Sequence, residues 1–476
     1  MKNRLPLLLI GLGILLAIVS LLADFIGLGD HGGIPAVQIL GAEAGVGLAL
    51  LGLGWGIHQR NGGRPGSGGW GEAVAWVLNQ PILTWVLLGF LIAYLLCFVA
   101  PAIYNPDLQF RYFTDYIRER EKIGFDTRLI LEHVSHWYTG EQTPKYLFPP
   151  LTTILFTPLL LLRFPHTYYV STVVTLVSFA LLNLWLPWRF LPKGERSLMP
   201  LLFVVTAVSY GLQFELETGQ FYTLAMLSSM AALYIFHRQP AWRIFAYMLF
   251  CVSVQLKIFP AIFVFLFVDN WRDWRVNLKR FAALGLANFL LLFLLGFSYF
   301  QLFVTRILGS LGNLEVRYNH SITVFVHNLA GTNAWAAENA DWLKAALFGW
   351  FLLCFAAALF LGWKRNAGGL DATLLMVSLI GGLILPTISH DYNLPLLSLP
   401  FLLWTSGLRL PEKPWTRLLA LLLLLLASFA FAVTLFPSNA RPAALENSLP
   451  ALMIILTAVT GLGFMQRQYE PESKVS

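Results

Sequence analysis

The chain has 476 residues, of which 57% are hydrophobic and only 12% are charged, a balance that excludes an ordinary soluble globular domain and predicts an integral membrane protein. The net charge of +7 does not indicate a nucleic-acid partner, because Lys and Arg lie mostly in short loops between apolar runs, as the positive-inside bias requires. The three cysteines, Cys97, Cys251 and Cys354, all lie inside apolar runs, which argues against a disulfide framework or a cysteine metal site.

Apolar runs recur along almost the whole chain, and several are long enough to cross a bilayer. We therefore expect an all-α polytopic membrane protein with about 12–14 transmembrane or half-membrane helices, since a spanning helix needs about 20 apolar residues. The expected apolar helices are 5–27, 35–57, 77–100, 166–187, 198–214, 221–236, 244–256, 281–300, 345–363, 372–386, 394–408, 416–436 and 448–464.

The domain organisation follows from a change in composition after the second apolar run. Residues 1–60 form a two-helix transmembrane prefix, and 61–75, rich in Gly and basic residues, read as a flexible cytoplasmic linker. Residues 76–465 form the main transmembrane body, with a large outer loop at 101–148. The polar residues 466–476 are expected to be a cytoplasmic tail.

The distribution of basic residues sets the expected orientation. If the Lys- and Arg-rich loops are cytoplasmic, residues 101–165, 215–220, 301–343 and 387–393 lie outside. This requires two apolar stretches not to cross fully: one carries Pro149, Pro150 and Pro158, and the other breaks at "LKIFP". Broken helices at membrane depth are tolerated where they line a cavity or are buried in protein, so we expect an outward-facing cavity.

The outer loop concentrates charge, since residues 101–148 hold 13 of the 57 Asp, Glu, Lys and Arg residues. Residues 110–119 and 126–138 each place apolar side chains on one face and polar side chains on the other. This pattern is typical of amphipathic helices that lie in the membrane plane. His133 and His136, three apart on the second helix, have no obvious third metal ligand, so we expect them on the surface.

Five short motifs with chemically active side chains fall on the expected outer face. Each is weak alone, but ionisable groups near the hydrocarbon persist mainly where they pair or take part in chemistry. The motifs are "NPDLQF" with Asp107, "YLFPPL" with Tyr146, "ELETGQFYTL" with Glu215, Glu217 and Gln220, "VQLKIFP" with Lys257, and the pair "RYNHS" and "SHDYN" with Asn319, His320, His390 and Asp391.

In this order the motifs resemble those of the polyprenyl-phosphate-sugar-dependent glycosyltransferases of the C-type (GT-C) membrane fold. The likeness covers about residues 77–408 and is nearest to the bacterial α-1,2-mannosyltransferase family, which includes the enzymes that build phosphatidylinositol mannosides. It implies transfer of a sugar, most favourably mannose, from a polyprenyl-phosphate donor to a lipid or glycan acceptor. The reaction would invert the anomeric carbon and take place on the extracytoplasmic face of the cell membrane.

The resemblance also implies roles for the motif residues. Asp107 would be the general base, and Lys257 and His390 would contact the departing phosphate, with Asp391 orienting His390. The other expected contacts of the donor are Gln220, Asn319, His320 and Tyr146.

Several of these residues also have purely structural interpretations. Asp107 fits a helix N-cap, Lys257 could reach the interface by snorkelling, and Gln220 fits a helix cap. Asp115 is a rival carboxylate, although a salt bridge to Arg111 four residues earlier explains it. Glu217, with Glu215 two residues before it, could bind a cation.

The sequence predicts no obligatory metal or other cofactor. It contains no Asp-x-Asp motif, and Lys and His alone can neutralise a monophosphate leaving group. The main alternative function is a transporter or flippase of lipid-linked glycans, which would also be polytopic and use broken helices. Such proteins usually show repeat symmetry and charge at mid-membrane, whereas here charge gathers in one outer loop. A purely structural subunit would not require the motif residues on one face.

Overall fold

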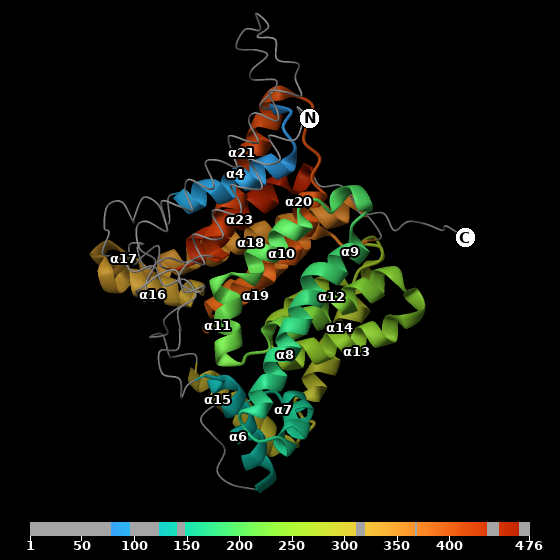
Figure 1. Ribbon diagram of the computed structural model, residues 1–476, viewed down its shortest axis with the longest axis vertical. Coiled ribbons are helices and arrows are strands. Elements are labelled where there is room, and N and C mark those ends of the chain that lie inside the picture. The colour runs from blue at the N-terminus through green and yellow to red at the C-terminus, as the bar shows by residue number, and fades with distance from the viewer. Residues whose placement is uncertain are drawn as a thin grey trace, which may run out of the picture.

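The computed structural model of the chain describes residues 78–95, 123–139, 148–310, 319–366, 369–435 and 447–465, and every regular element in these ranges is a helix (Figure 1). Three helical stretches are long and apolar enough to cross a membrane, namely His166–Phe190, Ala340–Arg365 and Pro414–Leu435. The bent pair Met199–Ala207 and Tyr210–Thr218 could form a fourth span, and shorter apolar helices accompany them. The expected all-α polytopic membrane class is confirmed. The prefix, the linker and the tail lie outside the described residues.

The helices of the described ranges carry the labels used in Figure 1. In chain order they are α4 (Ile82–Tyr94), α6 (Phe125–Thr139), α7 (Pro150–Phe156), η3 (Thr157–Leu161), α8 (His166–Ala180), η4 (Leu181–Trp185), α9 (Leu186–Phe190), η5 (Lys193–Glu195), α10 (Met199–Ala207), α11 (Tyr210–Thr218), α12 (Tyr222–Arg238), η6 (Pro240–Trp242), α13 (Arg243–Leu256), η7 (Phe259–Leu266), α14 (Trp274–Leu291), α15 (Phe297–Ser310), α16 (Ile322–Thr332), α17 (Ala334–Glu338), α18 (Ala340–Arg365), α19 (Ala372–Ile384), η8 (Asp391–Leu397), α20 (Ser398–Ser406), α21 (Pro414–Leu435), α23 (Leu449–Leu462) and η9 (Gly463–Met465).

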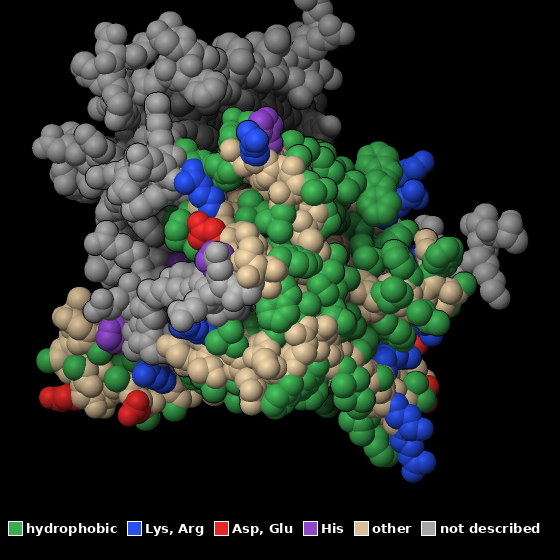
Figure 2. Space-filling view, turned by 90° about the horizontal axis from the view of Figure 1, so that it is seen from below, with side chains coloured by type: hydrophobic (Ala, Val, Ile, Leu, Met, Phe, Trp, Pro, Cys, Tyr) green, Lys and Arg blue, Asp and Glu red, His purple; other side chains and the backbone are tan. Residues whose placement is uncertain are grey.

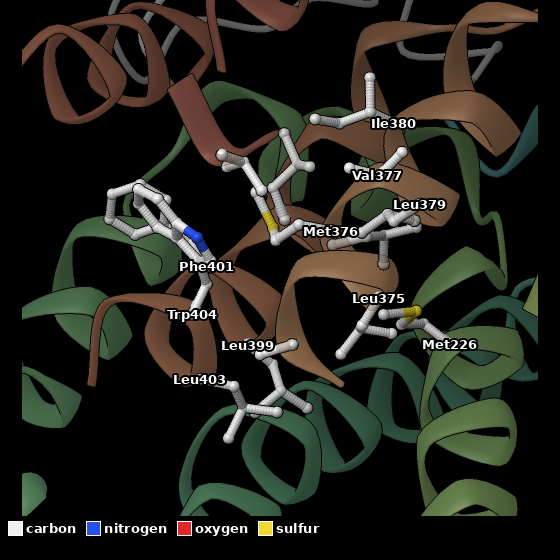
Figure 3. Close-up of a cluster of buried hydrophobic side chains, with 14 of the residues drawn as sticks. Met226, Leu375, Met376, Val377, Leu379, Ile380, Leu399, Phe401, Leu403 and Trp404 are labelled. Atoms are coloured by element: carbon white, nitrogen blue, oxygen red, sulfur yellow. The ribbon is translucent and has the colours of Figure 1, made fainter. Parts of the chain in front are cut away.

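The core is built around α19, whose residues are all buried. A helix that is hydrophobic on every side is buried in protein or faces lipid. In α19 the neighbours are protein, since it packs against η7, α18, α20 and α23. Figure 3 shows Met376 and Leu379 of α19 close to Phe401 and Trp404 of α20 and Met226 of α12. Gly381 allows a close approach, because an added Cβ would lie 2.4 Å from the Phe351 ring.

The outer helices expose large apolar side chains. Val173 on α8, Leu286 on α14 and Leu352 on α18 are each more than half exposed. Figure 2 shows a broad area of hydrophobic and uncharged side chains that separates small groups of charged ones. A surface of this kind suits contact with lipid, where apolar side chains need no shielding from water.

The two breaks expected from proline are confirmed. The short helix α7 ends at Phe156, before Pro158, and continues only as η3. The helix α13 ends at Leu256, and Lys257 then takes an extended backbone, with φ −148° and ψ 138°, before η7 begins at Phe259.

Two expected continuous helices are wrong in detail. Residues 198–214 form no continuous helix, because α10 ends at Ala207 and α11 begins at Tyr210, with a bend of 50° between them. At the bend, the Ser209 hydroxyl accepts a hydrogen bond from the Leu212 amide and so caps α11. Residues 281–300 are also divided, since α14 ends at Leu291 and a turn with Gly296 at φ 94° precedes α15.

The second amphipathic helix of the outer loop is present as α6, Phe125–Thr139, and buries Ile130 and Val134 on one side. The expectation that His133 lies on the surface is wrong, because this side chain is fully buried. Its Nε2 lies 2.7 Å from the Tyr299 hydroxyl and 3.2 Å from the Thr153 hydroxyl. His133 therefore ties α6 to α7 and α15. The first amphipathic segment, 110–119, lies outside the described residues.

Candidate active site

The turn between α11 and α12 carries the "ELETGQFYTL" motif. Gly219 ends α11 in the left-handed region, at φ 72°. The carboxylate of Glu215 then folds back onto the start of α12, where it accepts hydrogen bonds from the Thr223 amide at 2.7 Å and the Thr223 hydroxyl at 2.6 Å. The exposed amides of this helix N-terminus are thus served by a carboxylate of the chain itself.

The neighbouring Glu217 makes one contact within α11 and one to the turn before α6. Its Oε1 accepts a hydrogen bond from Gln213 at 3.1 Å, and its carbonyl accepts one from the Gly124 amide at 2.7 Å. Both carboxylates thus accept hydrogen bonds from protein donors, Glu215 from Thr223 and Glu217 from Gln213. Among the described residues, no group of three His, Cys, Asp or Glu side chains is placed to hold a metal ion.

The structure brings Lys257 and Gln220 together, although they come from different motifs. Lys257 Nζ donates to Gln220 Oε1 at 2.6 Å. The ammonium also lies 4.0 Å from the centre of the Tyr222 ring and 4.4 Å from that of Phe221. These cation–π contacts hold the lysine ammonium against two aromatic rings. A snorkelling lysine would instead extend its ammonium to the membrane surface.

Asp126, at the start of α6, is the third polar member of this group, and the sequence motifs did not identify it. Its carboxylate lies close enough to the Gln220 side chain and the Lys257 ammonium for both to act on its pKa. Burial raises the pKa of Asp126 above its ordinary value, and these two interactions oppose the shift. In the sequence, Gly124 indicates a turn before α6, but nothing indicates that Asp126 lies next to Gln220.

Aromatic rings extend the site from Lys257 toward η8. Tyr222 stacks on Phe259 at 5.8 Å between ring centres and meets Tyr392 at 4.9 Å. Tyr392 in turn contacts Phe214 at 5.3 Å and His390 at 5.2 Å. Rings of this kind offer flat apolar faces with polar edges, which suit the faces of sugar rings. His390 is half-buried at the end of this series.

The "RYNHS" and "SHDYN" motifs meet across a short backbone contact between Asn319 and His390. His320 is fully buried, with Nδ1 3.0 Å from Asp391 Oδ1 and Nε2 2.9 Å from Ser389 Oγ. Both ring nitrogens are therefore occupied within the protein. Asp391, which was expected to orient His390, thus pairs with His320, a contact that no local pattern in the sequence indicates.

Asn319 also serves to join segments. Its side-chain nitrogen donates to the Thr387 carbonyl at 2.8 Å, and its side-chain oxygen accepts from the Ser321 amide at 2.9 Å. Its carbonyl accepts from Asn447 at 2.6 Å. Asn319 thus joins the residues before α16 to those before η8 and to Asn447.

Four segments that were expected on one face converge at this site. They are the start of α6, the α11–α12 turn, the residues before α16 and the residues before η8. Of the site residues chosen from the sequence, the structure places Gln220 and Lys257 in contact and Asn319, His320, His390 and Asp391 in a second, adjoining cluster. Asp107, Arg111, Asp115 and Tyr146 lie outside the described residues.

Comparison with known proteins gives one family. The model of glycosyltransferase family 87 matches residues 146–389. No curated protein matches the chain. The matched region runs from just before α7 to Ser389, so it contains Gln220, Lys257 and His320 and ends before Asp391. Asp126 and the rest of α6 precede it.

Proposed function

Because the chain belongs to glycosyltransferase family 87, we propose that it transfers a sugar, most favourably mannose, from a polyprenyl-phosphate donor. The acceptor is a hydroxyl of a membrane lipid or a glycan. The reaction takes place on the extracytoplasmic face of the cell membrane in a GT-C-like body, and it inverts the anomeric carbon. The bilayer holds the polyprenyl chain of the donor and any lipid acceptor.

The observation that supports this proposal best is the held ammonium of Lys257. When the bond between the anomeric carbon and the phosphate oxygen breaks, the leaving polyprenyl phosphate gains negative charge. A fixed cation that already faces the phosphate stabilises this charge without further reorganisation. Lys257 is supported by Gln220 and two aromatic rings, at the end of a broken helix, where the phosphate could reach it.

On the other side of the anomeric carbon, a base must take the proton of the acceptor hydroxyl. We assign this role to Asp107, which comes from the same outer loop as α6. The adjacent rings of Tyr222 and Tyr392 would contact the sugar, and His390 lies where it can approach the phosphate or the sugar. The chemistry needs no metal, since the leaving group is neutralised by side chains.

A test of the function uses purified protein in lipid nanodiscs with radiolabelled polyprenyl-phosphate mannose and a panel of lipid acceptors. We expect labelled sugar to move to an acceptor. The Asp107→Asn variant should lower kcat by about 10²–10⁴-fold, because general base catalysis contributes that much.

The Asp115→Asn variant, which changes the rival carboxylate of the same loop, is the matched control and should retain transfer. Wild-type rates in Asp107→Asn would remove Asp107 as the base. If the sugar never leaves its carrier while labelled lipid crosses the bilayer, the chain is a flippase and the transferase proposal fails.

A further inference from the structure

Asp126 is a charged residue of the site to which the proposed transfer step gives no role. It lies at the start of α6, outside the region shared with the family, where α6 docks on the α11–α12 turn that carries Gln220. We infer that Asp126 is a positioning residue, which acts through the Gln220 amide to hold the Lys257 ammonium ready for the donor phosphate. This inference rests on the proposed function and adds to it a residue from the outer loop.

The backbone around Asp126 is fixed by hydrogen bonds on both sides. The Gly124 amide donates to the Glu217 carbonyl at 2.7 Å, and the Thr127 hydroxyl donates to the Gly219 carbonyl at 2.9 Å. The first turn of α6 is therefore held against the α11–α12 turn. Asp126, which lies between these two anchors, is placed next to Gln220 by the docking of one element on another.

The side-chain amide of Gln220 can link the position of Asp126 to that of Lys257, because its oxygen accepts hydrogen bonds and its NH₂ group donates them. Its oxygen accepts from Lys257 Nζ at 2.6 Å, so its NH₂ group is left to donate, and the proposed acceptor is the carboxylate of Asp126, which the docking of α6 places beside this turn. Without Asp126, the amide could rotate and present its NH₂ group to the ammonium, which would repel it. The order Asp126, Gln220, Lys257 therefore has one favourable arrangement of donors and acceptors.

Because Gln220 lies between Asp126 and Lys257 in this arrangement, the charge of the lysine remains available to the donor phosphate. A carboxylate in direct contact with Lys257 would compete with the phosphate, whereas an intervening amide supports the ammonium and leaves its other N–H groups free to bind a ligand. Burial lowers the pKa of Lys257 to about 8, and the negative charges of Asp126 and Glu215 oppose that shift. Among the described residues, the titratable side chain of Tyr222 also lies against the ammonium. Asp126 thus helps to keep the lysine protonated.

A purely structural role for Asp126 is the competing explanation. A carboxylate in the first turn of a helix interacts favourably with the helix dipole. That role predicts a loss of thermal stability in any variant without the charge. It predicts that the effect of the variant does not depend on Gln220 and that phosphate binding does not change selectively.

The test measures binding of a short polyprenyl phosphate without sugar to the purified full chain in nanodiscs, alongside donor KM in the transfer assay. Asp126→Asn and Gln220→Leu should each raise the Kd for the probe about tenfold, since hydrogen bonds to charged groups have that weight. The double variant should bind within about twofold of Gln220→Leu alone, because the two residues act in series. The loss in Asp126→Asn should be larger at pH 8.5 than at pH 6.5.

Glu132→Gln on the exposed side of α6 is the matched control and should bind as the wild type does. Unchanged Kd in Asp126→Asn, or effects of Asp126→Asn and Gln220→Leu that multiply in the double variant, would overturn the inference. Asn fills the same space as Asp, so the variant should fold, and its unfolding temperature checks this. If wild-type protein binds the probe but never transfers sugar, the proposed function fails while the positioning role is still decided by the Kd values.

Discussion

The protonation of His133 shows how far one buried residue can depart from its ordinary behaviour. Its ring lies within hydrogen-bond distance of Tyr299 and Thr153, and burial lowers its pKa from 6.5 to about 4. The nearby His136 lowers the pKa of His133 in the same direction, because two positive charges would repel. The neutral ring is therefore the form that joins α6 to the rest of the protein.

Acid should destabilise the protein through His133. Between pH 6.5 and pH 4 the unfolded chain binds a proton that the folded site excludes, so stability falls as the pH falls. A pKa lowered by this amount corresponds to a loss of about 3 kcal/mol at most. Thermal unfolding of wild type and His133→Gln, followed between pH 7 and pH 4, should show a shallower pH dependence in the variant. The exposed His166→Gln is the control, and parallel curves for wild type and His133→Gln would refute the prediction.

At the same scale, the sequence identified the side chains of the site better than their partners. Lys257 and Gln220 could be chosen because a helix break and a Gly-Gln pair mark the ends of buried helices. Asp126 could not, since only the docking of α6 on the α11–α12 turn brings it to Gln220. The pairing of His320 with Asp391 joins residues 71 apart in the chain, and no local pattern specifies it.

At the scale of elements, helix breaks were predicted where proline causes them and missed where other residues do. Proline removes a donor and clashes with the preceding turn, so the breaks near Pro158 and Pro260 follow from the residue type alone. The break before α11 depends instead on the Ser209 cap, and the one before α15 on Gly296 in the left-handed region. Serine and glycine are common inside membrane helices, so their presence does not by itself indicate a break.

The contact between α6 and the α11–α12 turn depends on Gly219. Its φ of 72° favours glycine, and a Cβ there would lie 2.2 Å from the Thr127 hydroxyl oxygen. Gly219→Ala should therefore lower the free energy of unfolding by about 1–3 kcal/mol, the usual range for backbone strain. It should also weaken donor binding, because it displaces Asp126.

The matched control for this element is Gly285→Ala on α14, where an added Cβ meets nothing within 4 Å. It should leave the unfolding temperature unchanged or raise it slightly, since alanine favours the helix. Thermal unfolding and donor KM measured on both variants check the prediction. Equal unfolding temperatures for the two variants would show that the α6 contact is not held by Gly219.

At the scale of the whole molecule, the site and the arginine-rich helix ends lie at opposite ends of the α12–α13 pair. The helix α12 starts beside Gln220 and runs 17 residues to Arg238, or about 25 Å at 1.5 Å per residue. The helix α13 then returns to Lys257. At the far end, Asp269 pairs with Arg243 at 2.6 Å and with Arg280 at 3.1 Å. From the positive-inside bias, we expect the arginine-bearing end to be the cytoplasmic one.

This orientation predicts which residues a membrane-impermeant maleimide can reach in intact cells. In a background without Cys97, Cys251 and Cys354, the Glu132→Cys variant should be labelled from outside, because Glu132 is exposed on α6 near the site. The Lys279→Cys variant, at the exposed start of α14, should be labelled only after the membrane is permeabilised. The reverse pattern would place Lys257 and its aromatic neighbours on the cytoplasmic side. Cytoplasmic donors would then have direct access to the site, and an extracytoplasmic polyprenyl-phosphate sugar could not be its substrate.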